Sequence, residues 1–113
     1  QILEAFAAFT LQLHETGVLH RDYSPGNILI KQHSDSVEFK IIDVNRMQFK
    51  TLDLQERLTN FARLMVDDST MKIMLERYAL LMNCPPAPML MQAIQYRDAF
   101  ARKRALKNKL RGR

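Results

Sequence analysis

The side chains best suited to chemistry in this 113-residue chain stand between residues 20 and 43. His20, Arg21 and Asp22 are consecutive, Asn27 follows after four intervening residues, and Asp43 ends a later apolar run. A carboxylate can accept or orient a proton. Carboxylate and amide oxygens are also the hard ligands that Mg²⁺ prefers. The pattern H-R-D-x-x-x-x-N with a later Asp therefore offers one proton acceptor and two metal ligands.

Short strands are expected to position these residues. An apolar strand at Val18–Leu19 leads into a loop at residues 20–27, which contains Pro and Gly. Two further strands, Ile28–Lys31 and Val37–Ile42, are separated by the turn residues QHSDS and predict a hairpin. A single hairpin is not stable alone in water, so it must lie on a helical body.

Hydrophobic periodicity predicts that body. We expect helices over residues 1–16, from Thr51 or Asp53 to about Val66, from a cap at Asp68 or Ser69 to about Asn83, and from about Met89 into a basic tail. The expected buried stripes are Ile2, Leu3, Phe6, Phe9 and Leu13, then Leu54, Leu58, Phe61 and Met65, then Met71, Met74, Leu75, Tyr78 and Leu81. The predicted fold class is mainly α with a small β-hairpin (α+β).

Composition is that of one globular domain, with 47% hydrophobic and 26% charged residues. No apolar run approaches the roughly 18 residues of a membrane span. We expect Cys84 to be a small buried residue in a reducing compartment, and His14 and His33 to lie on the surface without metal partners. The seven methionines are interpreted mainly as core residues.

The strings HRDYSPGNILI and FKIIDVNR resemble the catalytic and metal-binding loops of the protein-kinase-like superfamily. The resemblance covers residues 1 to about 66 well and the later helices more loosely. It implies a C-terminal lobe over residues 1–96, with a catalytic loop at 20–27 and a metal-binding loop at 43–46. It also implies ATP and Mg²⁺ as cofactors, and His20 and Arg21 as supports of the catalytic loop.

Phosphoryl transfer explains this spacing physically, because it needs an aligned acceptor hydroxyl and cations over the phosphate oxygens more than covalent help. Asp22, at the loop apex, would accept or orient the acceptor proton. Asn27 and Asp43 would bind magnesium together with the nucleotide phosphates. Each residue alone has an ordinary alternative as a turn or strand-end residue. Their order on the expected elements favours the catalytic interpretation.

Departures from the protein-kinase pattern point to a small acceptor. Ser24 stands where protein Ser/Thr kinases generally carry a Lys, and Val44 and Asn45 replace Phe-Gly after the metal-binding Asp. No A-P-E motif follows, and a helix is expected within roughly a dozen residues of Asp43. This leaves little room for a platform that binds a protein substrate.

The stretch IIDVNRMQF, the helix LQERLTNFARL and the basic tail are similar to the lipopolysaccharide core kinases of the Kdo and heptose kinase family. The resemblance implies ATP-dependent phosphorylation of a sugar hydroxyl in the lipopolysaccharide inner core. It gives Asp22 the catalytic role and Asn27 and Asp43 the metal-binding role. Arg46 would pair with Asp43, contact an anionic acceptor or remain a plain surface residue, and Ser24 is a second possible contact.

Residues 97–113 hold eight of the chain's 17 Lys and Arg residues and one of its 12 acidic residues. Such a basic helix can lie on an anionic membrane, which would place the protein at the cytoplasmic face of a bacterial inner membrane. A solvated tail is the alternative. Nucleic acid is not expected as a partner, because no binding motif or aromatic platform is present. The predicted membrane-contacting residues are Arg102, Lys103, Arg104, Lys107 and Lys109.

The nucleotide site of this superfamily also needs an N-terminal lobe with a Gly-rich loop. The only glycines are Gly17, Gly26 and Gly112, and the first residue is Gln1 without a signal-peptide pattern. We therefore expect a piece of a longer protein that lacks this lobe and has little activity alone. Other hypotheses stay open: a kinase for another small molecule or for protein, a pseudokinase, and a membrane or nucleic-acid adaptor.

Overall fold

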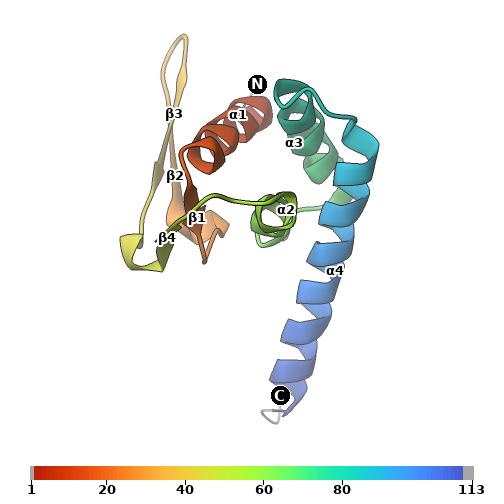
Figure 1. Cartoon of the computed structure of the whole chain (residues 1–113). Helices are drawn as coiled ribbons and strands as arrows, with labels where there is room; N and C mark the ends of the chain where they lie inside the picture. The colour runs from red at the N-terminus through yellow and green to blue at the C-terminus, as the bar shows by residue number, and fades with distance from the viewer. Residues whose placement is uncertain (1, 111–113) are drawn as a thin grey trace.

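The computed structural model describes residues 2–110, which form helices and short antiparallel strands (Figure 1). The helices are α1 (Ile2–Glu15), α2 (Leu54–Ala62), α3 (Asp68–Leu81) and α4 (Pro86–Leu110). The strands are β1 (Val18–His20), β2 (Ile28–Gln32), β3 (Val37–Ile41) and β4 (Met47–Phe49). Two single turns of 3-10 helix, η1 (Pro25–Asn27) and η2 (Val44–Arg46), lie between strands. The predicted α+β class is confirmed.

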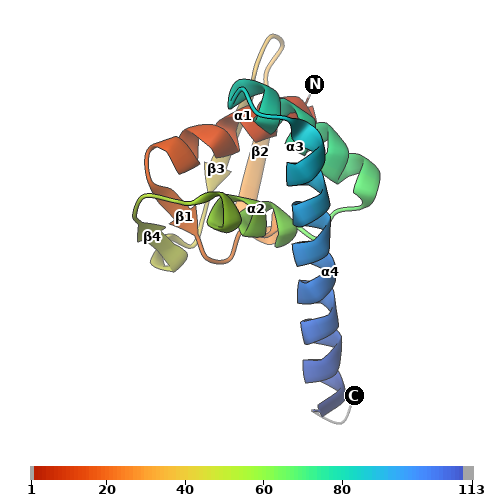
Figure 2. The same ribbon diagram turned by 45° about the vertical axis from the view of Figure 1, so that its right-hand side comes forward.

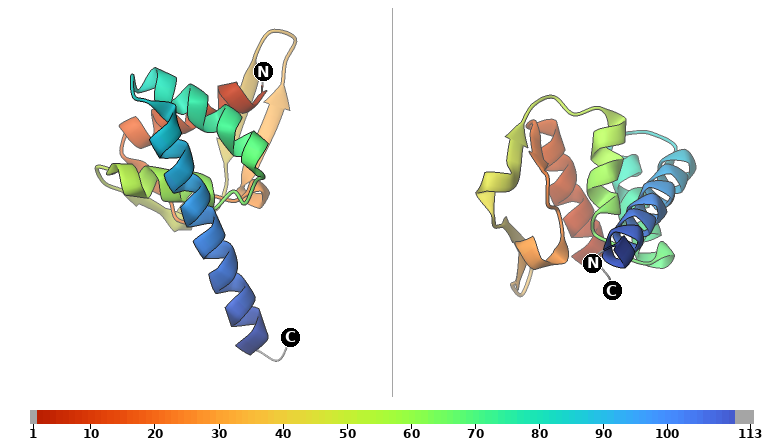
Figure 3. Two further views of the ribbon diagram at one scale, coloured as in Figure 1. Left: turned by 90° about the vertical axis from the view of Figure 1, so that its right-hand side faces the viewer. Right: turned by 90° about the horizontal axis from the view of Figure 1, so that it is seen from below.

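The four helices share one apolar core, in which α1 packs on α3, α3 on α4 and α2 on α4 (Figure 2). The C-terminal part of α4 projects beyond this body, which makes the molecule elongated at 48 × 30 × 29 Å (Figure 3). The apolar core residues are Phe6, Ala7, Tyr23, Leu58, Phe61, Leu64, Met71, Met74, Leu75, Tyr78, Ala79, Met89 and Ala93.

The predicted hairpin is confirmed as β2 paired antiparallel with β3, with Ile28 opposite Ile41 and Gln32 opposite Val37. One face of the hairpin packs on α1, where Phe39 makes an edge contact with Phe6 at a centroid distance of 5.4 Å. A second antiparallel pair was not predicted: β1 pairs with β4, and His20 lies opposite Met47. Strand β4 has only three residues, too few for a periodic pattern.

Several helix boundaries differ from the prediction. Helix α2 ends at Ala62, four residues early, because the chain turns sharply and Met65 has a positive φ of 56°. Helix α3 is capped by Asp67, whose carboxylate accepts from Thr70 N. Helix α4 begins earlier than predicted, at Pro86, since a proline fits the first turn of a helix.

Two burial predictions were wrong. His14 is 2% exposed, because both ring nitrogens have polar partners inside the helical body. Cys84 is exposed, because it follows the end of α3 at the surface. Three residues of the predicted buried stripes are also exposed, with exposed fractions of 37% or more. The methionines, which were interpreted mainly as core residues, lie partly in the core and partly at the surface. The exposed stripe residues are Leu54, Met65 and Leu81, and the fully buried methionines are Met71, Met74 and Met89.

A buried chain of hydrogen bonds ties the predicted catalytic loop to the helical body. Asn60 Nδ2 of α2 donates to the carbonyl oxygen of His20 over 2.8 Å. His14 Nε2 of α1 lies 2.9 Å from Asn60 Oδ1, and His14 Nδ1 lies 2.7 Å from the Tyr78 hydroxyl of α3. Arg57 Nη1 donates to that hydroxyl over 3.2 Å. Three helices therefore hold one backbone atom of the loop.

The direction of every bond in this chain follows from chemistry. The His20 carbonyl oxygen can only accept, so Asn60 Nδ2 donates to it and Asn60 Oδ1 accepts from His14 Nε2. Burial lowers the pKa of His14 to about 4, so the ring is neutral and carries its single hydrogen on Nε2. His14 Nδ1 therefore accepts from the Tyr78 hydroxyl, which in turn accepts from Arg57.

Gly17 makes the connection between α1 and β1 possible. Its φ is +81°, and a Cβ there would lie 2.8 Å from the carbonyl oxygen of Lys50. We expect Gly17→Ala to lower the free energy of unfolding by at least about 1–2 kcal/mol, the usual penalty for an L-residue in the left-handed region. Urea unfolding measures this loss. Gly26→Ala is the matched control, since a Cβ at that position would point into open space, with nothing within 4 Å; equal stability of the two variants would contradict the explanation.

The neutral His14 predicts a pH dependence of stability. Its folded-state pKa of about 4 lies below the ordinary 6.5. As the pH falls below 6.5, His14 becomes protonated in the unfolded chain but stays neutral in the folded chain. The free energy of unfolding therefore decreases as the pH is lowered. We expect a fall of about 1.4 kcal/mol per pH unit between pH 6.5 and 4, measured by urea unfolding. His14→Gln should flatten this slope and His33→Gln, at an exposed position, should not; equal slopes in both variants would contradict it.

Candidate functional site

Backbone hydrogen bonds bring the two predicted loops together. His20 Nε2 donates to the carbonyl oxygen of Ile42 over 2.9 Å, and Ile42 N donates to the carbonyl oxygen of Asn27 over 2.9 Å. Arg21 N donates to the carbonyl oxygen of Arg46 over 2.8 Å. Loop 20–27 and loop 43–46 therefore lie side by side, although 15 residues separate them along the chain.

His20 links these loops through both ring nitrogens. Its Nδ1 accepts from the backbone N–H of Asp22 over 3.0 Å, which fixes the ring hydrogen on Nε2, where it donates to Ile42. The ring is 1% exposed. His20 thus has no ring nitrogen free to contact a substrate, and it holds the backbone of Asp22 in place.

Asp22 and Asn27 are oriented by each other. Asn27 Nδ2 donates to the Asp22 carbonyl oxygen over 2.9 Å and to its Oδ2 over 3.2 Å. Both partners are acceptors, so the amide nitrogen of Asn27 must face them and its amide oxygen points elsewhere. One carboxylate oxygen of Asp22 is bound, and the other is available at an exposed position.

Asp43 has a backbone conformation that is unusual for its residue type. Its φ and ψ are 64° and 61°, in the left-handed region that aspartate tolerates better than most residues. The chain turns there into η2, and Asp43 O accepts from Arg46 N over 3.1 Å. The Asp43 carboxylate does not cap this turn. It is exposed beside Ile42, whose backbone binds Asn27.

The other predicted site residues supply no fixed polar contact through their side chains. Ser24 precedes η1, and only its backbone forms hydrogen bonds. Within residues 2–110 the side chains of Arg21 and Arg46 form no ion pair, so the possible pairing of Arg46 with Asp43 is not observed. Both arginines are exposed.

Tyr23 is a supporting residue that the sequence analysis missed. It is fully buried, stacks on Phe6 at 5.7 Å, and its hydroxyl lies 2.7 Å from Thr10 Oγ1 of α1. Burial raises the pKa of this phenol well above its usual range. A tyrosine directly after a predicted catalytic Asp, inside a polar loop, was the available signal, since a bulky aromatic residue in such a loop needs a place to pack.

The donor chemistry of Asn27 and Asp43 fits magnesium. The amide oxygen of Asn27 and the carboxylate of Asp43 are hard ligands, and both are left without hydrogen-bond partners among residues 2–110. That part of the chain has no group of three or more His, Cys, Asp and Glu side chains that could hold a metal ion. Two protein ligands leave most positions of an octahedral ion for phosphate oxygens and water.

Helix α4 runs without interruption across the boundary predicted between residues 96 and 97. Arg97 anchors it, with Nη1 2.7 Å from Asp68 and 3.0 Å from the carbonyl oxygen of Val66. Of the apolar residues of this segment, Tyr96 and Phe100 are partly buried on the body, whereas Leu106 is 58% exposed. The predicted membrane-contacting residues Arg102, Lys103, Arg104, Lys107 and Lys109 are all exposed.

None of the helices in residues 2–110 combines the length and the apolar character of a membrane-spanning segment. The sequence matches the family described as "Lipopolysaccharide kinase (Kdo/WaaP) family" over residues 1–82. This range includes both loops and helices α1 to α3, and all of α4 lies outside it. It confirms the resemblance seen in the sequence: the chain belongs to the lipopolysaccharide kinase (Kdo/WaaP) family, a family of phosphotransferases.

Proposed function

We propose that this chain forms the C-terminal lobe of a kinase-like enzyme that transfers the γ-phosphate of ATP to a sugar hydroxyl, of Kdo or heptose, in the lipopolysaccharide inner core. Family membership supports phosphate transfer connected with lipopolysaccharide. The observation that carries the residue assignment is the joining of the two loops. Hydrogen bonds from His20 and Ile42 join the loop that carries Asp22 and Asn27 to the end of β3, just before Asp43, and support the proposal that the three residues act together.

Asp22 acts on the acceptor hydroxyl. Its Oδ2 is held by Asn27, and the other carboxylate oxygen accepts the proton of the sugar O–H. The sugar oxygen forms a bond to the γ-phosphorus, the bond from that phosphorus to the bridging oxygen breaks, and ADP leaves with the electron pair. Asp22 then releases the proton to water. The bonds of His20 keep the backbone of Asp22 fixed during this step.

Asn27 and Asp43 hold Mg²⁺ through the amide oxygen and the carboxylate. When bound, the ion offsets negative charge on the phosphate oxygens. Arg46 follows Asp43 by one turn of η2 and is exposed without an acidic partner among residues 2–110, so it is free to meet an anionic group. Ser24 lies in the same loop as Asp22 and is a second polar contact for the acceptor.

The nucleotide base packs on the outer face of the hairpin and on a second lobe. Leu29 is 52% exposed and Ile42 is 41% exposed, both beside the proposed magnesium ligands. Exposed apolar groups at this position suit a flat aromatic ligand. The three glycines of the chain do not form a Gly-rich phosphate loop. We therefore propose that transfer requires a longer protein and that residues 1–113 alone turn over slowly.

Asp22→Asn tests the catalytic assignment. In a protein that includes the upstream lobe, we expect transfer of labelled γ-phosphate to lipopolysaccharide core acceptors to fall about 10²- to 10⁴-fold, the usual contribution of a general base. Nucleotide affinity should be unchanged. Asp35→Asn, in the exposed hairpin turn, is the matched control.

A variant Asp22→Asn that retains full transfer would refute the assignment. Label on a generic protein substrate alone would indicate a protein kinase. Nucleotide binding by the wild type without any transfer would favour a pseudokinase.

The basic end of α4 is proposed to hold the enzyme on the anionic cytoplasmic face of the inner membrane, where its acceptor is anchored. Lys107 and Lys109 are exposed near the end of α4, next to Leu106 and Leu110, which are 58% and 80% exposed. Exposed leucines among lysines suit an interface of headgroups and acyl chains.

Replacing both lysines by Gln should weaken binding to anionic vesicles about thirty-fold, since each cation near such a surface contributes about 1 kcal/mol. Sedimentation with vesicles measures this. The control Lys72→Gln with Arg77→Gln removes the same charge from α3. Equal binding to neutral vesicles, or no difference between the two double variants, would contradict membrane docking.

A further inference from the structure

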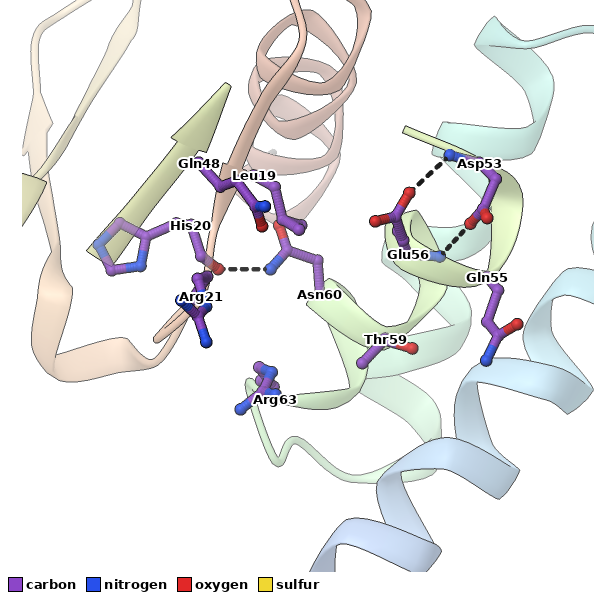
Figure 4. A pocket seen from close by; sticks show the side chains of 10 residues that line it. All are labelled: Leu19, His20, Arg21, Gln48, Asp53, Gln55, Glu56, Thr59, Asn60 and Arg63. Carbon is purple, nitrogen blue, oxygen red and sulfur yellow. Dashed lines mark hydrogen bonds between the residues drawn. The ribbon is translucent and has the colours of Figure 1, made fainter. Parts of the chain in front are cut away.

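A pocket of about 350 Å³ opens beside the catalytic loop, between β1, β4 and α2 (Figure 4). This volume lies within the range of about 300–1,000 Å³ of small-molecule sites. Its lining is mostly polar and comes from strand ends and from one face of α2. The lining residues are Leu19, His20, Arg21, Gln48, Asp53, Gln55, Glu56, Thr59, Asn60 and Arg63.

One end of the pocket is cationic. Arg21 and Arg63 lie there together, away from the two acidic residues of the lining (Figure 4). Neither guanidinium forms an ion pair within residues 2–110. Arg63 is held from behind by Phe100 of α4, whose ring centroid is 5.2 Å from its guanidinium carbon. Two neighbouring arginines without counter-charges favour an anion.

The other end of the pocket carries two carboxylates that already have hydrogen-bond or ion-pair partners within the protein. Asp53 accepts from Glu56 N over 2.8 Å, and Glu56 accepts from Asp53 N over 3.1 Å, which closes a capping box at the start of α2. Glu56 is also paired with the ammonium group of Lys50. Gln48, Gln55 and Thr59 add neutral polar groups to the lining. The pocket walls can therefore donate hydrogen bonds to, and accept them from, several hydroxyl groups of a ligand.

The pocket adjoins the proposed proton acceptor without containing it. Arg21 directly precedes Asp22 in the chain, yet Asp22 does not line the pocket. A group bound here is consequently close to the reacting hydroxyl but is not that hydroxyl. An oligosaccharide acceptor would place a neighbouring part of the molecule in this position.

We propose that this pocket binds an acidic sugar of the acceptor, with its carboxylate between Arg21 and Arg63 and its hydroxyls along Gln48, Gln55 and Thr59. The inference rests on the proposed function and specifies the chemical class of its acceptor. The carboxylate forms charge-assisted hydrogen bonds with two planar guanidinium groups. The neutral side chains select a polyhydroxylated ring, and Asp22 receives the hydroxyl that lies outside the pocket.

The test compares an acceptor that carries the sugar carboxylate with its methyl ester, using the protein with its upstream lobe. The wild type should have a KM about ten- to one hundred-fold lower for the acid, the range of a charge-assisted hydrogen bond. Arg63→Gln should raise the KM for the acid by that factor and leave the KM for the ester unchanged. Turnover of the ester shows that the variant is folded. Arg77→Gln, on α3 outside the pocket, is the matched control.

Equal KM values for acid and ester in the wild type would overturn the proposal, as would an equal loss for both acceptors in Arg63→Gln. Calorimetry measures binding of the acid independently of phosphate transfer, so it tests the pocket separately from the proposed reaction. If the acid binds, binding weakens in Arg63→Gln and no phosphate is transferred, the pocket is supported and the proposed reaction fails. If phosphate is transferred with no preference for the acid, the reaction is supported and the pocket assignment fails. If the acid neither binds nor reacts, both are refuted.

Discussion

The carbonyl oxygen of His20 is the point on which the candidate site depends. It is bound by Asn60 at the end of a buried chain of hydrogen bonds that passes through His14 and Tyr78 to Arg57. Because His14 is neutral, each of these hydrogen bonds has one direction of donation, and the chain has a single arrangement. A break would leave buried polar groups without partners, at a cost of about 1–3 kcal/mol each. Side chains of α1, α2 and α3 thus determine where loop 20–27 lies.

Within the candidate site, buried residues hold the backbone in place, and the proposed functional groups are exposed. His20 and Tyr23 are buried and hold loop 20–27 from inside, by hydrogen bonds and by stacking on α1. Asp22 and Asp43 are exposed at the same edge. A phosphotransfer site needs this combination, because the protein supplies position and charge while the substrates supply the bonds that change.

Local signals in the sequence predicted much of this arrangement. The hairpin followed from two apolar runs separated by turn residues, and α2 followed from a helix start expected at Thr51 or Asp53 and an apolar stripe behind it. The features that were missed depend on contacts between distant residues. Strand β4 exists because β1 lies beside it, and His14 is buried because Tyr78 and Asn60 meet its ring. No spacing within a helix reveals such partners. Motif resemblance indicated the proposed site residues Asp22, Asn27 and Asp43, but it did not indicate the pocket that Arg63 lines.

Helix α4 has a consequence for the geometry of the whole molecule. Its first part belongs to the core, Arg97 fixes it to the start of α3, and the same helix continues to Leu110. A helix rises about 1.5 Å per residue, so the segment after Arg97 extends about 20 Å. Because it is helical, it keeps its length, unlike a flexible linker whose ends vary in distance. Any surface that binds the basic end of α4 is therefore held at a fixed distance from loop 20–27, because the rigid helix sets that distance.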